Sequence, residues 1–232
     1  MLLSATGVAG HPNSYFHRAS VRKWADGLGL DVDPTVSKRT QLRAVFDAAR
    51  IAGQANTTLF GLRLQAHSLG FFLKQIEILH PDEPDDVARI RTEFGPTRFI
   101  LLQRASKLDQ AVSFLMATQT GLWHAGADGS EIERLAPPAD PVYDAARIRD
   151  TIVQLEGYDR LWEDWFVREG IAPLRLDYEA LSNDPHDILR QVLTTLNCDT
   201  DLTDTLSIPT MKLANATSRE WTARFREENA RP

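Results

Sequence analysis

Short runs of apolar residues alternate along this chain with longer segments in which apolar residues recur every three or four positions. The runs at 58–64, 98–103 and 173–178 are each bounded by polar or turn-forming residues. Such runs are typical of buried β-strands, and strands that alternate with helices favour a parallel sheet with helices on both faces. The pattern therefore predicts an α/β protein.

Helical periodicity is clearest at 108–123 and 144–169. The first segment places one apolar face on Leu108, Ala111, Val112, Leu115, Met116 and Trp123. Ser106 and Asp109 resemble a capping box at its start, and Gly170 closes the second segment. Two long helices are therefore expected, and we assign the second helix's Trp162, Trp165 and Phe166 to the core.

Further signals complete the outline. Asp184-Pro185 predicts a helix start, and Thr217 with Glu220 predicts the cap of the last helix. The stretch 125–141, with its glycines and paired prolines, predicts a surface loop or lid. No internal repeat is visible, so a single domain over 1–232 is expected.

Composition excludes several classes of protein. The net charge of −6 argues against a nucleic-acid coat, and the single cysteine, Cys198, excludes an internal disulfide. The histidines lack metal-ligand spacing, so no metal site is expected. No segment has the apolar length of a membrane span, and the start lacks the basic region of a signal peptide. We therefore expect a cytoplasmic protein with no membrane span and no nucleic-acid partner.

The most informative chemistry lies where the second predicted strand meets its helix. Arg104 stands at this junction, where the first helical N–H groups are unpaired and the helix dipole adds positive charge. Its guanidinium suits phosphate or sulfate. Ser106, Gln110 and Ser113 fall on one helical face, which places the Ser113 hydroxyl beside the strand end. An anion site is predicted here, although the chain has no glycine-rich phosphate loop.

Four blocks of sequence resemble the bacterial trehalose 2-sulfotransferase family, in the family's order. The first block is 6–16, and the second joins 104–113 to 119–124. The third is 176–185, which holds a Tyr-Glu-x-Leu-x-x-Asp-Pro motif, and the fourth is 212–221. Together these blocks span nearly the whole chain.

The resemblance implies a P-loop NTPase-like parallel sheet flanked by helices, the sulfotransferase fold. It also implies metal-free transfer of a sulfuryl group from 3′-phosphoadenosine 5′-phosphosulfate to a hydroxyl of a small acceptor such as a carbohydrate, by a homodimer. Arg104 and Ser113 would hold the donor's 3′-phosphate, with Lys212 and Arg219 near the nucleotide. Tyr178 would support the nucleotide pocket.

On the acceptor side, the resemblance implies contacts from Tyr15, Phe16, Trp123 and His124. The family's proposed general base is a glutamate, at the position filled in this chain by Ser14. A serine cannot accept a proton near neutral pH, whereas a histidine can. Either His11 or His17 replaces the glutamate, or this chain acts on a different acceptor.

A second departure concerns the beginning of the fold. Family members start with a strand and a Ser/Gly-rich loop around the 5′-phosphosulfate, and this chain begins within the helix that follows. The missing elements amount to roughly 15–20 residues by ordinary element lengths. We expect either that the start codon was assigned too late or that the protein is truncated. A truncated protein would lack the first strand and the phosphosulfate loop.

There are two alternatives to a sulfotransferase, and the residues favour them to different degrees. The Ser14 replacement and the expected loss of the loop favour a non-catalytic domain that binds a nucleotide or a partner. A P-loop kinase relative is disfavoured because the chain has no Gly-Lys-Ser/Thr run.

Overall fold

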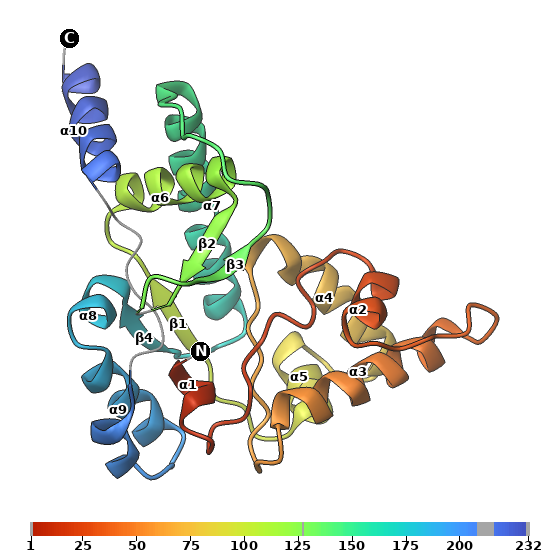
Figure 1. The fold of residues 1–232 in the computed structure, drawn as a ribbon. Helices are drawn as coiled ribbons and strands as arrows, with labels where there is room; N and C mark the ends of the chain where they lie inside the picture. Colours follow the sequence, from red (N-terminus) through yellow and green to blue (C-terminus); the bar gives the residue numbers. More distant parts are fainter. Residues whose placement is uncertain (1, 127, 208–215, 231–232) are drawn as a thin grey trace. The chain divides into compact units, whose positions relative to one another are not determined.

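The computed structural model describes residues 2–126, 128–207 and 216–230 (Figure 1). Internal contacts divide the chain into two compact units. Unit 1 comprises 1–101, 161–174 and 186–206, and unit 2 comprises 102–160, 175–185 and 207–232. The expectation of a single domain stays a prediction.

Unit 1 is mainly helical. Its elements are α1 (Leu2–Ala5), α2 (Val21–Gly27), α3 (Lys38–Gln54), α4 (Ala66–Leu79), α5 (Asp86–Phe94), the end of α7 (Ala145–Arg168), α9 (Pro185–Thr195) and the 3₁₀ helix η1 (Asp201–Thr205). Polar side chains cap three of these helices: Ser20, Ser37 and Asp85 each accept a hydrogen bond from a backbone N–H in the first turn.

The core of unit 1 is aromatic. Phe16 is fully buried, stacks on Phe46 at 4.7 Å between ring centroids, and meets Trp24 edge-on at 4.9 Å. Trp165 and Phe166 are also buried in this cluster, and Trp162 packs against it. The assignment of these last three residues to the core is confirmed.

In unit 2 the first and last helices, α6 and α10, pack against each other. Its elements are α6 (Lys107–Thr120), β2 (Leu122–Ala125), β3 (Glu131–Arg134), the first part of α7, α8 (Tyr178–Asn183) and α10 (Ala216–Ala230). Its core consists of Ala111, Val112, Leu115, Ile148, Trp221 and Phe225. Periodicity in 108–116 therefore identified the buried face of α6 correctly.

The small sheet that carries the candidate site joins β1 (Ile100–Gln103) to β4 (Leu174–Asp177) and is parallel. β1 leads through Arg104 into α6, and β4 leads directly into α8 at Tyr178. The predicted class, an α/β protein with a small parallel sheet and flanking helices, is confirmed.

Several predicted helices are also confirmed. The helix predicted at 144–169 is α7, and the start predicted at Asp184-Pro185 is that of α9. The last helix begins at Ala216, so Thr217 lies inside its first turn, and the prediction that Thr217 caps this helix is wrong. No helix of the described ranges is long and apolar enough to cross a membrane.

Three other expectations are wrong. No strand forms at 58–64, where the structure has only a single parallel bridge between Asn13 and Leu62. The Arg63 N–H donates to the Asn13 carbonyl in this bridge, but the His11 N–H, which is the next one facing this way, donates to the Gly53 carbonyl at 2.7 Å instead of extending the ladder.

The helix predicted to reach Trp123 ends at Thr120, because Gly121 adopts a left-handed conformation with φ of 74°. Trp123 therefore lies on β2. The stretch predicted as a loop contains β3, which pairs antiparallel with β2.

Candidate functional site

Arg104 lies between β1 and α6, at the junction predicted from the sequence. The Ser106 hydroxyl accepts a hydrogen bond from the Asp109 N–H at 3.2 Å and thereby caps α6. This capped turn fixes the backbone around Arg104, and it confirms the predicted role of Ser106. Arg104 thus stands beside the positive end of a helix.

The Arg104 side chain is held by two neighbours from the start of α8. Its Nε donates to Glu179 Oε1 at 3.3 Å, and its guanidinium carbon lies 4.6 Å from the ring centroid of Tyr178. The other oxygen of Glu179 accepts the Ala105 N–H at 3.3 Å. The two Nη atoms of Arg104 have no hydrogen-bond partner within the described ranges. The guanidinium is therefore fixed while its terminal donors remain available for an anion.

Lys107 contributes to the same corner in a different way. Its ammonium donates to the Arg104 carbonyl at 2.8 Å and pairs with Asp159 at 2.6 Å. A third contact reaches Gln110 at 3.3 Å. Because these acceptors surround Lys107, its charge stabilises the junction, and Arg104 supplies the donors left for a ligand.

The other residues that were predicted to bind the sulfuryl donor are not seen in contact with Arg104. Ser113 lies exposed on α6, and Arg219 lies exposed on α10. The structure brings neither side chain into contact with Arg104 within the described ranges. Lys212 lies outside the described residues. Only Tyr178, of the predicted partners, is seen against Arg104.

Trp123 and His124 both lie on β2. Trp123 meets Phe114 edge-on with 5.6 Å between ring centroids. His124 Nδ1 lies 2.6 Å from Glu133 Oε2, across the β2–β3 hairpin. The hairpin therefore fixes the His124 ring and leaves its Nε2 edge for other contacts.

A second polar cluster forms in unit 1 around Ser14. The Ser14 hydroxyl accepts a hydrogen bond from Arg63 Nε at 2.7 Å and another from the Gln65 side-chain amide. The two segments are joined by their backbones, since the Arg63 N–H donates to the Asn13 carbonyl at 3.0 Å. The fold thus places the Arg63 guanidinium and the Gln65 side-chain amide in contact with the Ser14 hydroxyl.

His17 is oriented by the same segment. Its Nδ1 lies 3.0 Å from the Ser14 carbonyl oxygen, which only accepts hydrogen bonds, so Nδ1 carries a proton. In a neutral imidazole the lone pair then lies on Nε2. His67 Nε2 in turn donates to the His17 carbonyl at 3.2 Å. The exposed His11 side chain has no such anchor among the described residues. His17 is therefore the better placed proton acceptor.

Tyr15 and Phe16 differ sharply although they are neighbours. The Tyr15 hydroxyl donates to the His11 carbonyl at 2.9 Å, and burial raises the pKa of Tyr15, which keeps it neutral. Phe16 is fully buried among the core aromatics. Its side chain therefore supports the 11–17 segment from within the core, whereas Tyr15 is the partly exposed member of the pair.

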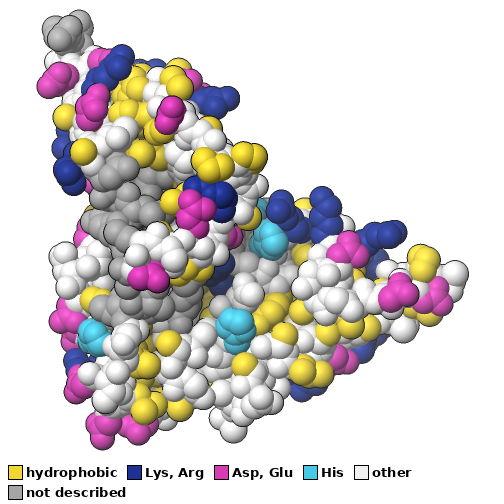
Figure 2. All heavy atoms as spheres, viewed as in Figure 1, with side chains coloured by type: hydrophobic (Ala, Val, Ile, Leu, Met, Phe, Trp, Pro, Cys, Tyr) yellow, Lys and Arg dark blue, Asp and Glu magenta, His cyan; other side chains and the backbone are white. Residues whose placement is uncertain are grey.

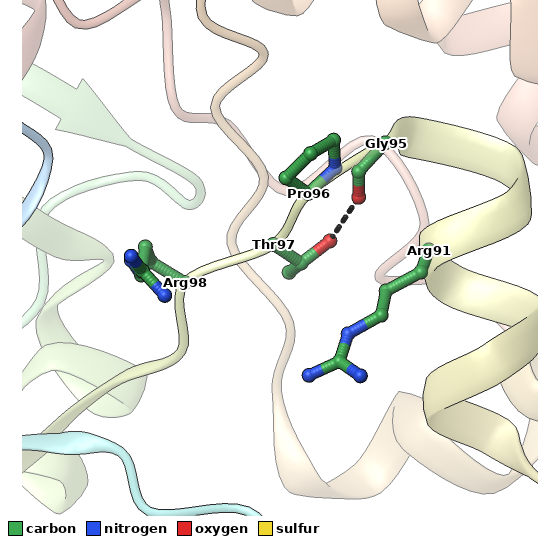
Figure 3. A pocket seen from close by; sticks show the side chains of 5 residues that line it. All are labelled: Arg91, Gly95, Pro96, Thr97 and Arg98. Atoms are coloured by element: carbon green, nitrogen blue, oxygen red, sulfur yellow. Dashed lines mark hydrogen bonds between the residues drawn. The ribbon is translucent and has the colours of Figure 1, made fainter.

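A separate cavity of about 410 Å³ lies in unit 1 (Figure 3) and is lined by Arg91, Gly95, Pro96, Thr97 and Arg98. The Thr97 hydroxyl donates to the Gly95 carbonyl at 2.8 Å. None of the predicted site residues lines this cavity. Among the residues that the structure describes, no group of His, Cys, Asp and Glu could hold a metal ion.

Comparison with known proteins gives the family. The sequence model of the Stf0 sulphotransferase family matches residues 1–228. This chain is a member of the Stf0 sulphotransferase family. The trehalose 2-sulfotransferase of Mycobacterium tuberculosis (strain ATCC 35801 / TMC 107 / Erdman) is 28% identical over 247 aligned residues, covering 99% of this chain and 89% of the relative. That of Mycolicibacterium smegmatis (strain ATCC 700084 / mc(2)155) is 26% identical with the same coverage.

Family membership confirms the resemblance read from the sequence blocks, and identifies the chain as a relative of transferases. Sequence reasoning nevertheless missed Glu179, Arg63 and Gln65. Glu179 stands beside Tyr178 in the recognised motif, so its position was a usable signal. Arg63 and Gln65 gave none, because only the folded chain brings them to Ser14.

Proposed function

We propose that this Stf0 family member transfers a sulfuryl group from 3′-phosphoadenosine 5′-phosphosulfate to a hydroxyl of a small acceptor of the carbohydrate class. A bond forms between the acceptor oxygen and sulfur, and the bond from sulfur to the 5′-phosphate oxygen breaks. The acceptor's proton passes to a base, and adenosine 3′,5′-bisphosphate leaves. Family membership and the names of the curated relatives support this reaction class.

The Arg104 arrangement is the observation that carries the proposal. Glu179 and Tyr178 fix the guanidinium, and its two Nη atoms lack partners in the described part of the chain. Such a fork binds a phosphate with two parallel hydrogen bonds. We assign it to the donor's 3′-phosphate.

The remaining donor-side assignments follow from the family resemblance. Ser113 would add a hydroxyl to the 3′-phosphate, and Lys212 and Arg219 would add positive charge near the nucleotide. Tyr178 would support the nucleotide pocket, which agrees with its stacking on Arg104. No metal is required for this transfer.

On the acceptor side, His17 fits the role of base best. Its Nδ1 proton is committed to the Ser14 carbonyl, so Nε2 can accept the proton of the acceptor hydroxyl. Tyr15, Trp123 and His124 have partly exposed side chains that can contact a sugar. Phe16 would hold this segment in place from the core. A homodimer remains part of the proposal, by resemblance alone.

The test is calorimetric binding of adenosine 3′,5′-bisphosphate to the full chain, to Arg104→Ala and to Arg147→Ala. Arg147 is exposed on α7, and its side chain pairs with neighbouring Asp144 and with no other carboxylate of the described residues, so it is the matched control. Losing a charge-assisted phosphate contact of about 1.5–3 kcal/mol weakens binding by roughly 10- to 100-fold. Equal affinities in all three proteins would contradict the assignment. Transfer of labelled sulfate to a panel of sugars then tests the reaction.

A further inference from the structure

The terminal nitrogens of Arg63, in unit 1, have no partner within the described ranges. Its Nε donates to Ser14 Oγ at 2.7 Å, and neither Nη atom has a hydrogen-bond or carboxylate partner there. Some other arginines of the same unit are paired with carboxylates: Arg43 lies 2.9 Å from Glu93, and Arg168 lies 2.9 Å from Asp86. Arg63 is exposed, so its free edge is open to a ligand.

The surroundings of Arg63 are depleted of negative charge. Neither 1–25 nor 48–76 contains an aspartate or glutamate, in a chain that holds 32 acidic residues. These two segments are joined at the Asn13–Leu62 bridge and again where His67 meets the His17 carbonyl. Figure 2 shows several Lys and Arg side chains over the α2 and α4 part of this unit, with acidic atoms between them. The local field therefore attracts anions although the whole chain is acidic.

Ser14 and Gln65 add polar atoms beside this cation. The Ser14 oxygen already accepts two hydrogen bonds, so its own proton is left to donate. The carbonyl oxygen of the Gln65 side chain is buried and has no partner in the structure. A buried acceptor without a partner is costly, and it can be satisfied only by a donor, so a hydroxyl of the ligand and not its anionic group would pair with this oxygen.

The cluster also rests on a rigid frame. Gly10 has φ of +70°, and a Cβ added there would lie 2.4 Å from the Leu59 carbonyl oxygen. A Cβ at Gly61 would lie 2.5 Å from the Pro12 ring. The two segments therefore fit together closely just before the Ser14–Arg63 contact, and His67 joins them again after it, so the donors are held in place before a ligand binds.

We propose that Arg63 and Ser14, with Gln65 orienting the Ser14 hydroxyl, bind a negatively charged group on the acceptor, so that the acceptor is a hydroxyl compound carrying a carboxylate or a phosphate. The identification of the bound compound as the sulfuryl acceptor rests on the proposed function, whereas the anion site itself does not. Arg63 would form paired hydrogen bonds to the anion, and Ser14 would donate a third. A neutral sugar would leave the Arg63 fork unpaired, which lowers its affinity.

The test compares three sugars that share one ring: glucose, glucuronic acid and glucose 6-phosphate. Each is titrated into the full chain, into Arg63→Gln and into Arg91→Gln, with binding followed by calorimetry. Arg91 is an exposed arginine of the same unit that does not contact Ser14, so it controls for net charge. We expect the charged sugars to bind the wild-type chain at least tenfold more tightly than glucose. Arg63→Gln should abolish this preference, and Arg91→Gln should retain it.

The identity of the better ligand separates a carboxylate from a phosphate. Equal binding of all three sugars by the wild-type chain, or a preference that survives in Arg63→Gln, would overturn the proposal. Adenosine 3′,5′-bisphosphate is titrated into the same proteins. If it binds Arg63→Gln more weakly, Arg63 serves the donor and the proposal is also overturned. If it binds none of them while the charged sugars bind, the proposed function fails and the anion site stands.

Discussion

The Glu179 carboxylate accepts hydrogen bonds from both the Arg104 side chain and the Ala105 backbone, each at 3.3 Å. One acidic residue at the start of α8 thereby orients the cation at the start of α6. Because Glu179 takes only the Nε edge of Arg104, it fixes the guanidinium without occupying its terminal donors.

Replacing Glu179 by glutamine tests this positioning role. The amide removes the negative charge and makes the Arg104 contact weaker, so we expect adenosine 3′,5′-bisphosphate to bind roughly 3- to 10-fold more weakly. Calorimetry at two salt concentrations measures the affinity. A purely structural role would instead lower the thermal midpoint and leave the affinity of the folded protein unchanged.

Replacing His17 by glutamine tests the proposed base. We expect kcat for sulfuryl transfer to fall about 100-fold or more, with donor KM little changed, since general base catalysis contributes about 10²–10⁴-fold. His11→Gln is the matched comparison, because His11 lies in the same segment without an anchored ring. A larger loss in His11→Gln than in His17→Gln would reverse the assignment.

Substitutions at two glycines distinguish the stability cost of a left-handed backbone from the cost of a steric clash. Gly10 and Gly29 have φ of +70° and +68°, but only Gly10 has backbone atoms where a Cβ would lie. Gly29→Ala should cost about 1–2 kcal/mol of the free energy of unfolding, for the left-handed conformation. Gly10→Ala should cost about 1–3 kcal/mol more, for the clash. Urea denaturation measures both, and equal losses would show that the Leu59 contact relaxes freely.

The cap of α6 should matter for stability. Ser106→Ala removes the hydrogen bond to the Asp109 N–H and should lower the free energy of unfolding by about 1 kcal/mol. Ser113→Ala makes the same chemical change on an exposed position of the same helix and should shift stability by less than about 0.5 kcal/mol. Denaturant titration distinguishes them, and similar losses would argue against a stabilising cap.

Alkaline pH should destabilise the chain partly through Tyr143. Burial and the hydrogen bond to Glu228 raise its pKa to about 12, from an ordinary value of about 10. The unfolded chain then loses this proton first, so the contribution to stability is complete below pH about 10 and is lost as pH rises to about 12. Thermal melts of wild type and Tyr143→Phe over this range should converge as pH rises. A constant difference between them would contradict the pKa shift.

Short-range signals predicted four of the helices, α6, α7, α9 and α10. The capping pair Ser106 and Asp109, the closing Gly170 and the opening Pro185 each act within one helical turn, and the structure places helix ends at or beside them. The Arg104 junction was predictable for the same reason, since a strand followed by a capped helix is a local pattern. The segment 58–64 was mispredicted because its apolar run forms only a single bridge, and the His11 N–H that could extend this bridge bonds to Gly53 instead.

The α/β class, several helix ends, the place of Arg104 and the resemblance to the family could all be predicted from the amino-acid sequence. The side chains that contact and orient these residues could be identified only from the folded chain. Glu179 lies 75 positions from Arg104, and Arg63 lies 49 positions from Ser14. Helix caps and periodicity depend on neighbours along the chain, whereas these contacts depend on where distant segments return in space. A local sequence pattern does not show which distant segments come into contact. The Ser14–Arg63 pair could therefore be recognised only in the folded chain.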